Sequence, residues 1–136
     1  MVGAFKPKMQ CITAKYADEW NISSTGIGKY RRLVADFERS CLEVGRDPGT
    51  VRRSWCGGCI LRPTQAEATL IAGERYDSDP NDDFDFVGTP SCILEQIRPF
   101  IDLGVRSFMF DCGGFPDLTT LELLIDKILP AVNNGE

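Results

Sequence analysis

The chain has 136 residues, enough for one domain with a core and too few for two. Its hydrophobic fraction of 43% and charged fraction of 26% are those of a soluble globular protein. A net charge of -5 without a basic run argues against nucleic-acid binding. No apolar run approaches the roughly 20 residues of a membrane span, and no signal peptide is visible, so we expect a cytoplasmic protein.

Six cysteines and the absence of histidine limit the available chemistry. Most of the cysteines fall at apolar positions of predicted helices or strands, so we expect reduced thiols that pack as small hydrophobes. Without histidine the chain lacks the commonest general base and the commonest metal ligand. Catalysis would then rest on carboxylates, lysine, tyrosine, cysteine or a cofactor.

The N-terminal residues predict a short strand that passes through a glycine turn into a helix started by Pro7. Such a turn is an anion site, because free backbone N–H groups and the positive end of the helix dipole point at one place. A phosphate cradle would use Gly3, Ala4, Phe5, Lys6 and Lys8. From these residues alone, an ordinary turn with surface lysines is the favoured alternative.

The first helix is expected to run to Tyr16, with Met9, Ile12 and Tyr16 on one apolar face. A short strand over 19–22 follows it. Trp20 and Asn21 stand at the end of this strand and could line a cofactor pocket. The other interpretation of Trp20 is a residue that caps the core, and both stay open here.

The clearest helix is predicted over 27–44, where apolar residues recur at three- and four-residue steps and Gly45 is placed as the C-terminal cap. Residues 51–61 are typical of a strand that Gly57 and Gly58 interrupt. Cys56 and Cys59 form a Cys-x-x-Cys pair in or beside that strand. A redox pair needs its first cysteine at a helix N-terminus, so a thiol–disulfide oxidoreductase is kept only as an alternative.

A zinc site that joins this pair to Cys92 and Cys112 lacks a second Cys-x-x-Cys spacing, so we expect no metal. Thr64 and Glu67 form a capping box that opens a helix to about Arg75. Residues 76–85 are acidic and predict a long exposed loop whose spacing does not fit an EF-hand.

The last part of the chain predicts two further helices around one strand. Thr89 and Pro90 open the first, which ends at Gly104 and which Pro99 should kink. A strand over 105–110 leads into a loop with Asp111, Cys112 and Gly113, where a barrel would place catalytic groups. The final amphipathic helix, 118–129, is expected to stop at Pro130. This alternation predicts a parallel sheet, either half of an eight-fold barrel or a small open sheet.

Four segments, taken in order, resemble the luciferase-like flavin oxidoreductases. Residues 13–21 resemble the A-x-Y-A-D-G-W-N segment of that family, and residues 41–48 resemble its C-x-x-x-G-R-D-P helix end. Residues 87–90 with 103–108 resemble its G-T-P unit followed by G-V-x-x-F, and residues 128–131 its closing helix. The resemblance covers nearly the whole chain but only the C-terminal half of the family.

The resemblance implies one domain over residues 1–136, a partial (β/α)8 TIM barrel with about four βα units that correspond to strands five to eight. It implies FMN or the deazaflavin coenzyme F-420 as cofactor, with the phosphate at the strand-five turn. This chain has Gly3-Ala4 where the family has Gly-Gly, and Asp18-Glu19 where the family has Asp-Gly. Ala4 would cost more than glycine if that position needs a positive φ.

By the same resemblance we expect an oxidoreductase subunit, a monooxygenase or a dehydrogenase, that acts on paired donors including a small-molecule substrate. The first four strands of the family are absent, and a half barrel leaves two open edges and an exposed apolar inner face. We therefore expect a homodimer or pairing with a separate N-terminal half. The competing hypothesis is a non-catalytic half barrel that needs a partner.

Overall fold

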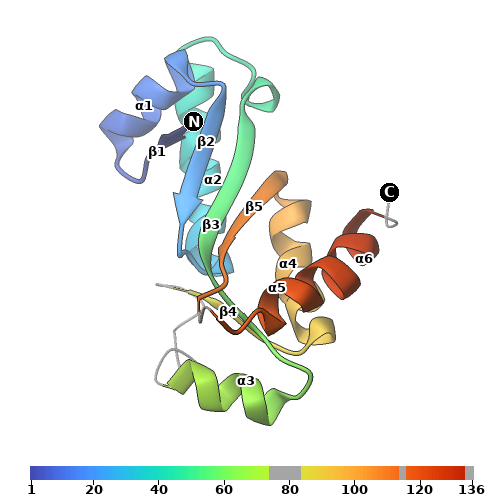
Figure 1. Ribbon diagram of the computed structural model, residues 1–136. Coiled ribbons are helices and arrows are strands. Elements are labelled where there is room, and N and C mark those ends of the chain that lie inside the picture. The colour runs from blue at the N-terminus through green and yellow to red at the C-terminus, as the bar shows by residue number, and fades with distance from the viewer. Residues whose placement is uncertain (74–83, 114–115, 134–136) are drawn as a thin grey trace.

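A computed structural model describes residues 1–73, 84–113 and 116–133 and shows an open, wholly parallel sheet (Figure 1). The described strands are β1 (Val2–Gly3), β2 (Glu19–Ser23), β3 (Arg52–Leu61), β4 (Phe86–Gly88) and β5 (Val105–Asp111). The order is β1-β2-β3, and β3 then pairs with β5 along its first part and with β4 at its end. The predicted α/β class is confirmed.

Helices connect the strands in the expected alternation. They are α1 (Pro7–Tyr16), α2 (Ile27–Glu43), the short 3-10 turn η1 (Pro48–Thr50), α3 (Gln65–Ala72), α4 (Pro90–Asp102), α5 (Thr119–Leu123), the π-helical turn η3 (Leu124–Ile128) and α6 (Leu129–Asn133). The capping box of Thr64 and Glu67 is present, and Gly45 has a φ of 72° after α2. Among the described residues, no helix combines the length and the apolar character that crossing a membrane requires.

The core lies between the sheet and the helices α2 and α4. Trp20 stacks on Phe37 of α2 with ring centroids 4.3 Å apart, and Trp55 meets the edge of Phe86 at 4.7 Å. Phe100 of α4 contacts the ring of Tyr30 and the rings of Trp55 and Phe86. This aromatic layer holds the helices on one face of the sheet, and β2 and β3 lie in front of α2 in Figure 1.

The prediction that Gly57 and Gly58 interrupt β3 is wrong, because the strand runs unbroken from Arg52 to Leu61. A Cβ on Gly57 would lie 2.4 Å from the Trp55 ring, and one on Gly58 would lie 2.6 Å from the Asp85 carboxyl carbon. At these two glycines, other groups therefore approach the strand closely. A glycine with this role and a glycine that ends a strand look the same in the sequence pattern.

The apolar face predicted for α1 does not face the described core. Met9, Ile12 and Tyr16 are exposed, whereas Gln10, Thr13 and Ala14 are buried against α2. The Gln10 amide nitrogen donates to the Leu33 backbone oxygen at 3.5 Å, so this helix–helix contact is partly polar. The apolar stripe of α1 thus faces away from the described core.

Pro130 does not end the last helix, which continues as α6 to Asn133. A proline cannot donate and collides with the carbonyl four residues earlier. The preceding π-helical turn η3 places the Leu129 N–H on the Leu124 oxygen, one residue further back than in an α-helix, and this wider turn accommodates the proline. The helix α4 likewise runs through Pro99.

The strand β4 is not predicted from the sequence, because its three residues lie between the acidic segment and the helix that Thr89 opens. The predicted acidic loop falls mainly on residues 76–83, which lie outside the described residues, as does the predicted helix end at Arg75.

Candidate functional site

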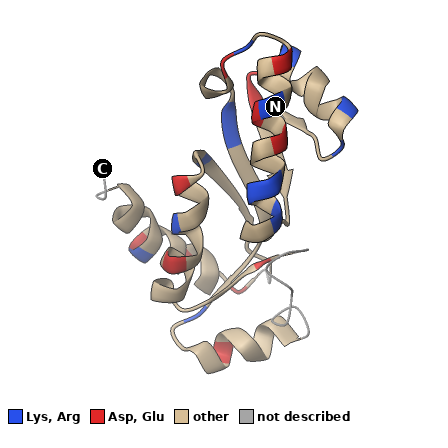
Figure 2. Cartoon of the chain, turned by 180° about the vertical axis from the view of Figure 1, so that it is seen from behind, with Lys and Arg blue, Asp and Glu red and all other residues tan. Residues whose placement is uncertain are grey.

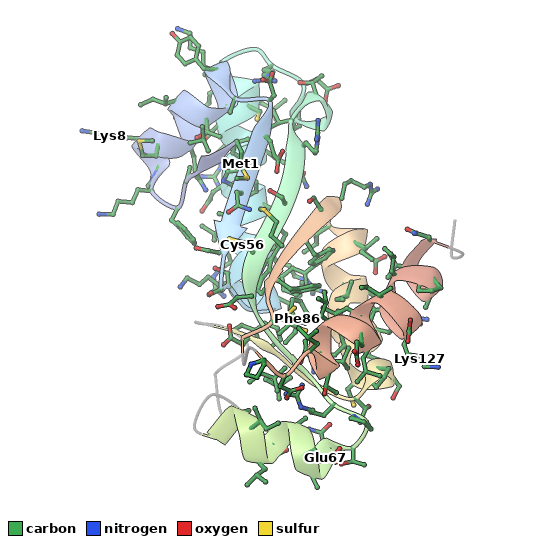
Figure 3. The ribbon with its side chains drawn as sticks, in the orientation of Figure 1. Met1, Lys8, Cys56, Glu67, Phe86 and Lys127 are labelled. Atoms are coloured by element: carbon green, nitrogen blue, oxygen red, sulfur yellow. The ribbon has the colours of Figure 1, made fainter. Side chains whose placement is uncertain are left out.

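The turn from β1 into α1 has the geometry of an anion site. Lys6 is the N-cap of α1, makes no side-chain capping bond, and no acidic residue lies in the first turn. The first helical bond runs from Gln10 N to Lys6 O at 2.9 Å, so the preceding N–H groups of Lys8 and Met9 have no helical acceptor. Lys6 and Lys8 are exposed, and Lys8 extends away from the sheet (Figure 3). This donor set fits a phosphate.

Ala4 fits its position without backbone strain. Among the described residues, Ser24 is the non-glycine residue that has a positive φ. Ala4 therefore does not have one, and its backbone adopts an ordinary conformation. Its methyl group is buried in the core, and its carbonyl oxygen accepts a hydrogen bond of 2.9 Å from Trp20 Nε1. The replacement of a glycine by Ala4 therefore carries no conformational cost here, while Gly3 remains exposed beside it.

Trp20 and Asn21, predicted together as pocket residues, point to opposite faces of β2. The Trp20 ring is fully buried between Tyr30 and Phe37 on the helix side, as expected of a core-capping residue. Asn21 lies on the other face and is the member of the pair that can reach a ligand on the inner side of a barrel. The alternation of a strand separates adjacent residues in this way.

A polar cluster surrounds Asn21 on that inner face. Its amide nitrogen donates to Ser54 Oγ at 3.0 Å, and Cys56 Sγ donates to its Oδ1 at 3.2 Å. The Met1 sulfur lies 3.8 Å from Ser54 Oγ, and Figure 3 labels Met1 and Cys56 along these strands. No pattern in the sequence indicates Ser54 as a neighbour of Asn21, because only the register of β2 and β3 brings the two together.

The inner face is polar and not apolar as expected. The residues that share the orientation of Asn21 along β2 and β3 include Glu19 and Arg52, which form an ion pair at 3.9 Å, and the registered pair Ser23 and Cys56. Trp20, Ile22 and Trp55 point to the helices of the main core instead, and Ile60 packs in a separate small cluster with α3. This face can hydrogen-bond a polar ligand more readily than it can bury an apolar one.

Cys56 and Cys59 do not form a redox pair in this fold. They lie three residues apart in one strand, so their side chains take opposite faces and their Cα atoms are about 10 Å apart. A disulfide needs at most about 7 Å. Burial, with Cys112 and Asp85 adding to it, raises the pKa of Cys59 to about 12, which disfavours a reactive thiolate. No group of three or more His, Cys, Asp or Glu side chains suited to a metal occurs within the described ranges.

Asp111, at the end of β5, uses its carboxylate locally. Its Oδ1 accepts a 3.0 Å bond from Gly113 N and so shapes the turn after the strand. Burial raises the pKa of the neighbouring Cys112. Because all strands are parallel, this turn and the Gly3 turn open on the same edge of the sheet.

No family model and no curated protein sequence matches the chain. The chain does match solved structures of other proteins. Coenzyme F-420-dependent tetrahydromethanopterin reductase from Methanopyrus kandleri aligns with a TM-score of 0.74 and 15% identity over 95% of this chain and 49% of that one. Riboflavin lyase, solved with modified FMN and riboflavin, aligns with a TM-score of 0.77 and 12% identity over 97% and 42%. The oxygenating constituent of 3,6-diketocamphane monooxygenase from Pseudomonas putida, in complex with FMN, aligns with a TM-score of 0.68 and 14% identity over 95% and 47%.

The chain has the fold of these enzymes. It spans about half of their length, so the partial (β/α)8 barrel expected from the motifs is confirmed. Its assignment to strands five to eight stays a prediction from the motifs. The identities are too low to carry more than the fold, and the cofactors named above belong to those proteins.

Proposed function

We propose that this chain is part of an oxidoreductase of the luciferase-like type and holds the phosphate of FMN or coenzyme F-420. The observation that carries the proposal is the uncapped N-terminus of α1, with Lys6 and Lys8 beside it, at the edge of a sheet with that fold. In the solved neighbours this fold accompanies FMN or coenzyme F-420. The cofactor, when bound, would supply the hydride or oxygen chemistry.

The chain's own residues would bind and orient. The N–H groups of Lys8 and Met9 and the two ammonium groups would neutralise a phosphate dianion. Asn21 would present its amide to the flavin side of the site, held in place by Ser54 and Cys56. Phe5, exposed between the two lysines and Gly3, would cover the approach to the phosphate.

This half barrel would supply one wall of the site. The described sheet is open at β1 and at β5, so a substrate pocket that excludes water needs further strands. We propose that these come from a partner, either a second copy of the chain or a separate N-terminal half. Without that partner we expect cofactor binding to be weak and turnover to be absent.

Titration of the purified chain with FMN, coenzyme F-420 and riboflavin, followed by flavin or deazaflavin fluorescence, tests this assignment. Riboflavin lacks the phosphate, so FMN should bind more tightly than riboflavin. Changing Lys6 and Lys8 together to glutamine should weaken FMN binding about tenfold, or ~1.4 kcal/mol. It should leave riboflavin binding unchanged.

Lys15→Gln is the matched control, because Lys15 is an exposed lysine at the other end of the same helix. Equal affinity for FMN and riboflavin, or an unchanged affinity in the Lys6 and Lys8 variant, would refute a phosphate site at this turn. Absence of any binding would favour the non-catalytic half barrel.

A further inference from the structure

The sheet has an open edge on each side. Among the described strands, β1 pairs only with β2, and β5 pairs only with β3. The two edges lie on opposite sides of the molecule, with β1 beside α1 and β5 beside α4 to α6 (Figure 1). Parallel strands are seldom left unpaired and uncovered, because a free edge recruits other strands.

An exposed apolar stripe flanks the first edge. We call Met9, Ile12 and Tyr16 the α1 stripe; these side chains are between 42% and 72% exposed. They recur at steps of three and four residues and so share one side of α1. This is the spacing with which a helix packs along a neighbouring helix. Nothing in the described chain covers the stripe.

A second stripe flanks the other edge. The C-terminal stripe consists of Leu118, which caps α5, and of Leu121, Ile125 and Leu129 on α5, η3 and α6; these side chains are between 43% and 54% exposed. Next to it, a groove of about 310 Å³ separates β5 from these helical turns, lined by apolar residues that include Phe108, Phe110, Leu124 and Ile128. Val2 of β1 shares the orientation of the buried Trp20, so its side chain belongs to the same apolar layer as this groove.

The charges of the two flanks complement each other. The α1 flank carries Lys6, Lys8 and Lys15 and no acidic residue; lysine and arginine positions are coloured blue along the cartoon in Figure 2. The C-terminal flank carries Glu122 and Asp126 against Lys127. Two α1 flanks would repel each other, and two C-terminal flanks would not attract each other. An α1 flank would attract a C-terminal flank of the other copy.

We propose that a second copy of this chain closes the barrel. In this dimer β5 of each copy pairs in parallel with β1 of the other, and the C-terminal stripe of each copy packs on the α1 stripe of the other. The strands β1, β2, β3 and β5 are four in each copy, so two copies supply the eight of a closed barrel.

A two-fold axis along the barrel relates the two copies, so both contacts form at once. No open edge of these strands is then left for a third copy, and association stops at two. The lengths agree, since this chain spans 49% of the reductase and 47% of the diketocamphane enzyme. Two copies therefore supply about the length of one such neighbour. The dimer does not depend on cofactor binding, so its test is independent of the proposed function.

Light scattering coupled to gel filtration measures the mass directly. We expect about twice the 15.1 kDa of one chain. Ile12→Glu and Ile125→Glu should each weaken association on the order of a hundredfold, because each places a charge in an apolar contact that occurs twice. Circular dichroism should show unchanged helix content. Leu70→Glu is the matched control, because Leu70 is an 83% exposed leucine on α3, away from both edges.

Mixing the two variants distinguishes this dimer from others. In a mixed pair one contact is wild-type on both sides and the other carries both substitutions, so association should partly return. A dimer that joined like flanks would not recover in this way. A wild-type chain that stays monomeric, or a dimer that survives both substitutions, would overturn the proposal. The monomer result would point to a separate N-terminal half.

Charge reversal gives a second test that does not disturb packing. Lys8→Glu and Asp126→Lys, each made alone, should weaken the dimer, and the double variant should recover part of the loss. Both side chains are exposed, so neither change threatens the fold. Additive weakening in the double variant would count against the pairing of these two flanks.

Discussion

At the residue scale, Arg46 shows a structural use for a family-like motif. Its Nη1 donates to the backbone oxygens of Ala14 at 3.0 Å and Ala17 at 2.8 Å, the last carbonyls of α1. Its Nε donates to Thr50 Oγ1 at 3.0 Å. Asp47 accepts from Gly49 N at 2.8 Å and closes the turn. Through these hydrogen bonds, residues 46–50 connect the end of α1 to the turn before β3.

Arg46→Ala should lower the free energy of unfolding by ~1–3 kcal/mol, because two partly buried carbonyls lose a charged donor. Urea unfolding followed by circular dichroism measures the change. Arg32→Ala, on the exposed side of α2, is the control and should change stability by less than ~0.5 kcal/mol. Equal effects of the two changes would contradict the capping role.

Tyr30 is a second residue with an unusual environment. Its ring is fully buried against Trp20 and Phe100, and its hydroxyl has no hydrogen-bond partner among the described residues. Burial raises the pKa of Tyr30 to about 12, with Arg53 acting slightly in the other direction. Folding therefore favours the neutral phenol.

The raised pKa sets the sign of an alkaline effect. The stability due to neutral Tyr30 is fully present below the ordinary tyrosine pKa of about 10 and is lost as the pH rises through about 12. Tyr30→Phe should remove this loss, and at neutral pH it should leave stability unchanged or higher by ~1 kcal/mol. Unfolding between pH 8 and 12, with phenolate absorbance as the monitor, checks both. Ionisation of Tyr30 near pH 10 in the folded chain would contradict the assignment.

At the element scale, β3 is the strand that the rest of the sheet depends on, because it pairs with β2, β4 and β5. Its two glycines permit this role. The Trp55 ring covers Gly57 on the helix side, and the Asp85 carboxylate accepts from Gly58 N at 2.9 Å. The strand thus accommodates the aromatic core at a point where any larger residue would displace it.

Gly57→Ala should destabilise the chain by ~1–3 kcal/mol, since the added methyl group would lie 2.4 Å from the Trp55 ring. Thermal unfolding with tryptophan fluorescence reports both the stability and the moved ring. Gly3→Ala is the control in a strand of the same sheet, because its Cβ would make an ordinary 3.8 Å contact. An unchanged melting temperature for Gly57→Ala would show that the ring moves aside at no cost.

At the scale of the whole molecule, the chain has its aromatic core on one face of its sheet and a more polar face, with Asn21 and Ser54 buried and Ser23 exposed, on the other. The aromatic layer between the sheet and α2 and α4 explains how the half barrel folds. The open edges and the two exposed stripes explain why it would associate. Stability and assembly are therefore carried by different surfaces.

This separation predicts a melting temperature that rises with protein concentration, because only the folded chain presents the two stripes. A hundredfold increase in concentration, measured by scanning fluorimetry, should raise it by several degrees for the wild type. The Ile125→Glu variant should show no such dependence and should melt at the wild-type value for low concentration. A melting temperature independent of concentration would argue that folding and association are not linked.

Local signals in the sequence determined the order of the elements other than β4, the capping box of Thr64 and Glu67, the cap at Gly45 and the α/β class. Each of these depends on neighbours within a few residues. The start of α1 belongs to the same group, since Pro7 marks the first turn of the helix.

The tertiary structure alone decided the rest. Gln10 and Thr13 are buried and Met9 is exposed because the position of α2 determines which side of α1 is inside. Cys56 and Cys59 are separated because their strand is unbroken, and Asn21 meets Ser54 because two distant strands share a register. Register and packing join residues far apart in the chain, and no local pattern encodes which distant residue will be the neighbour.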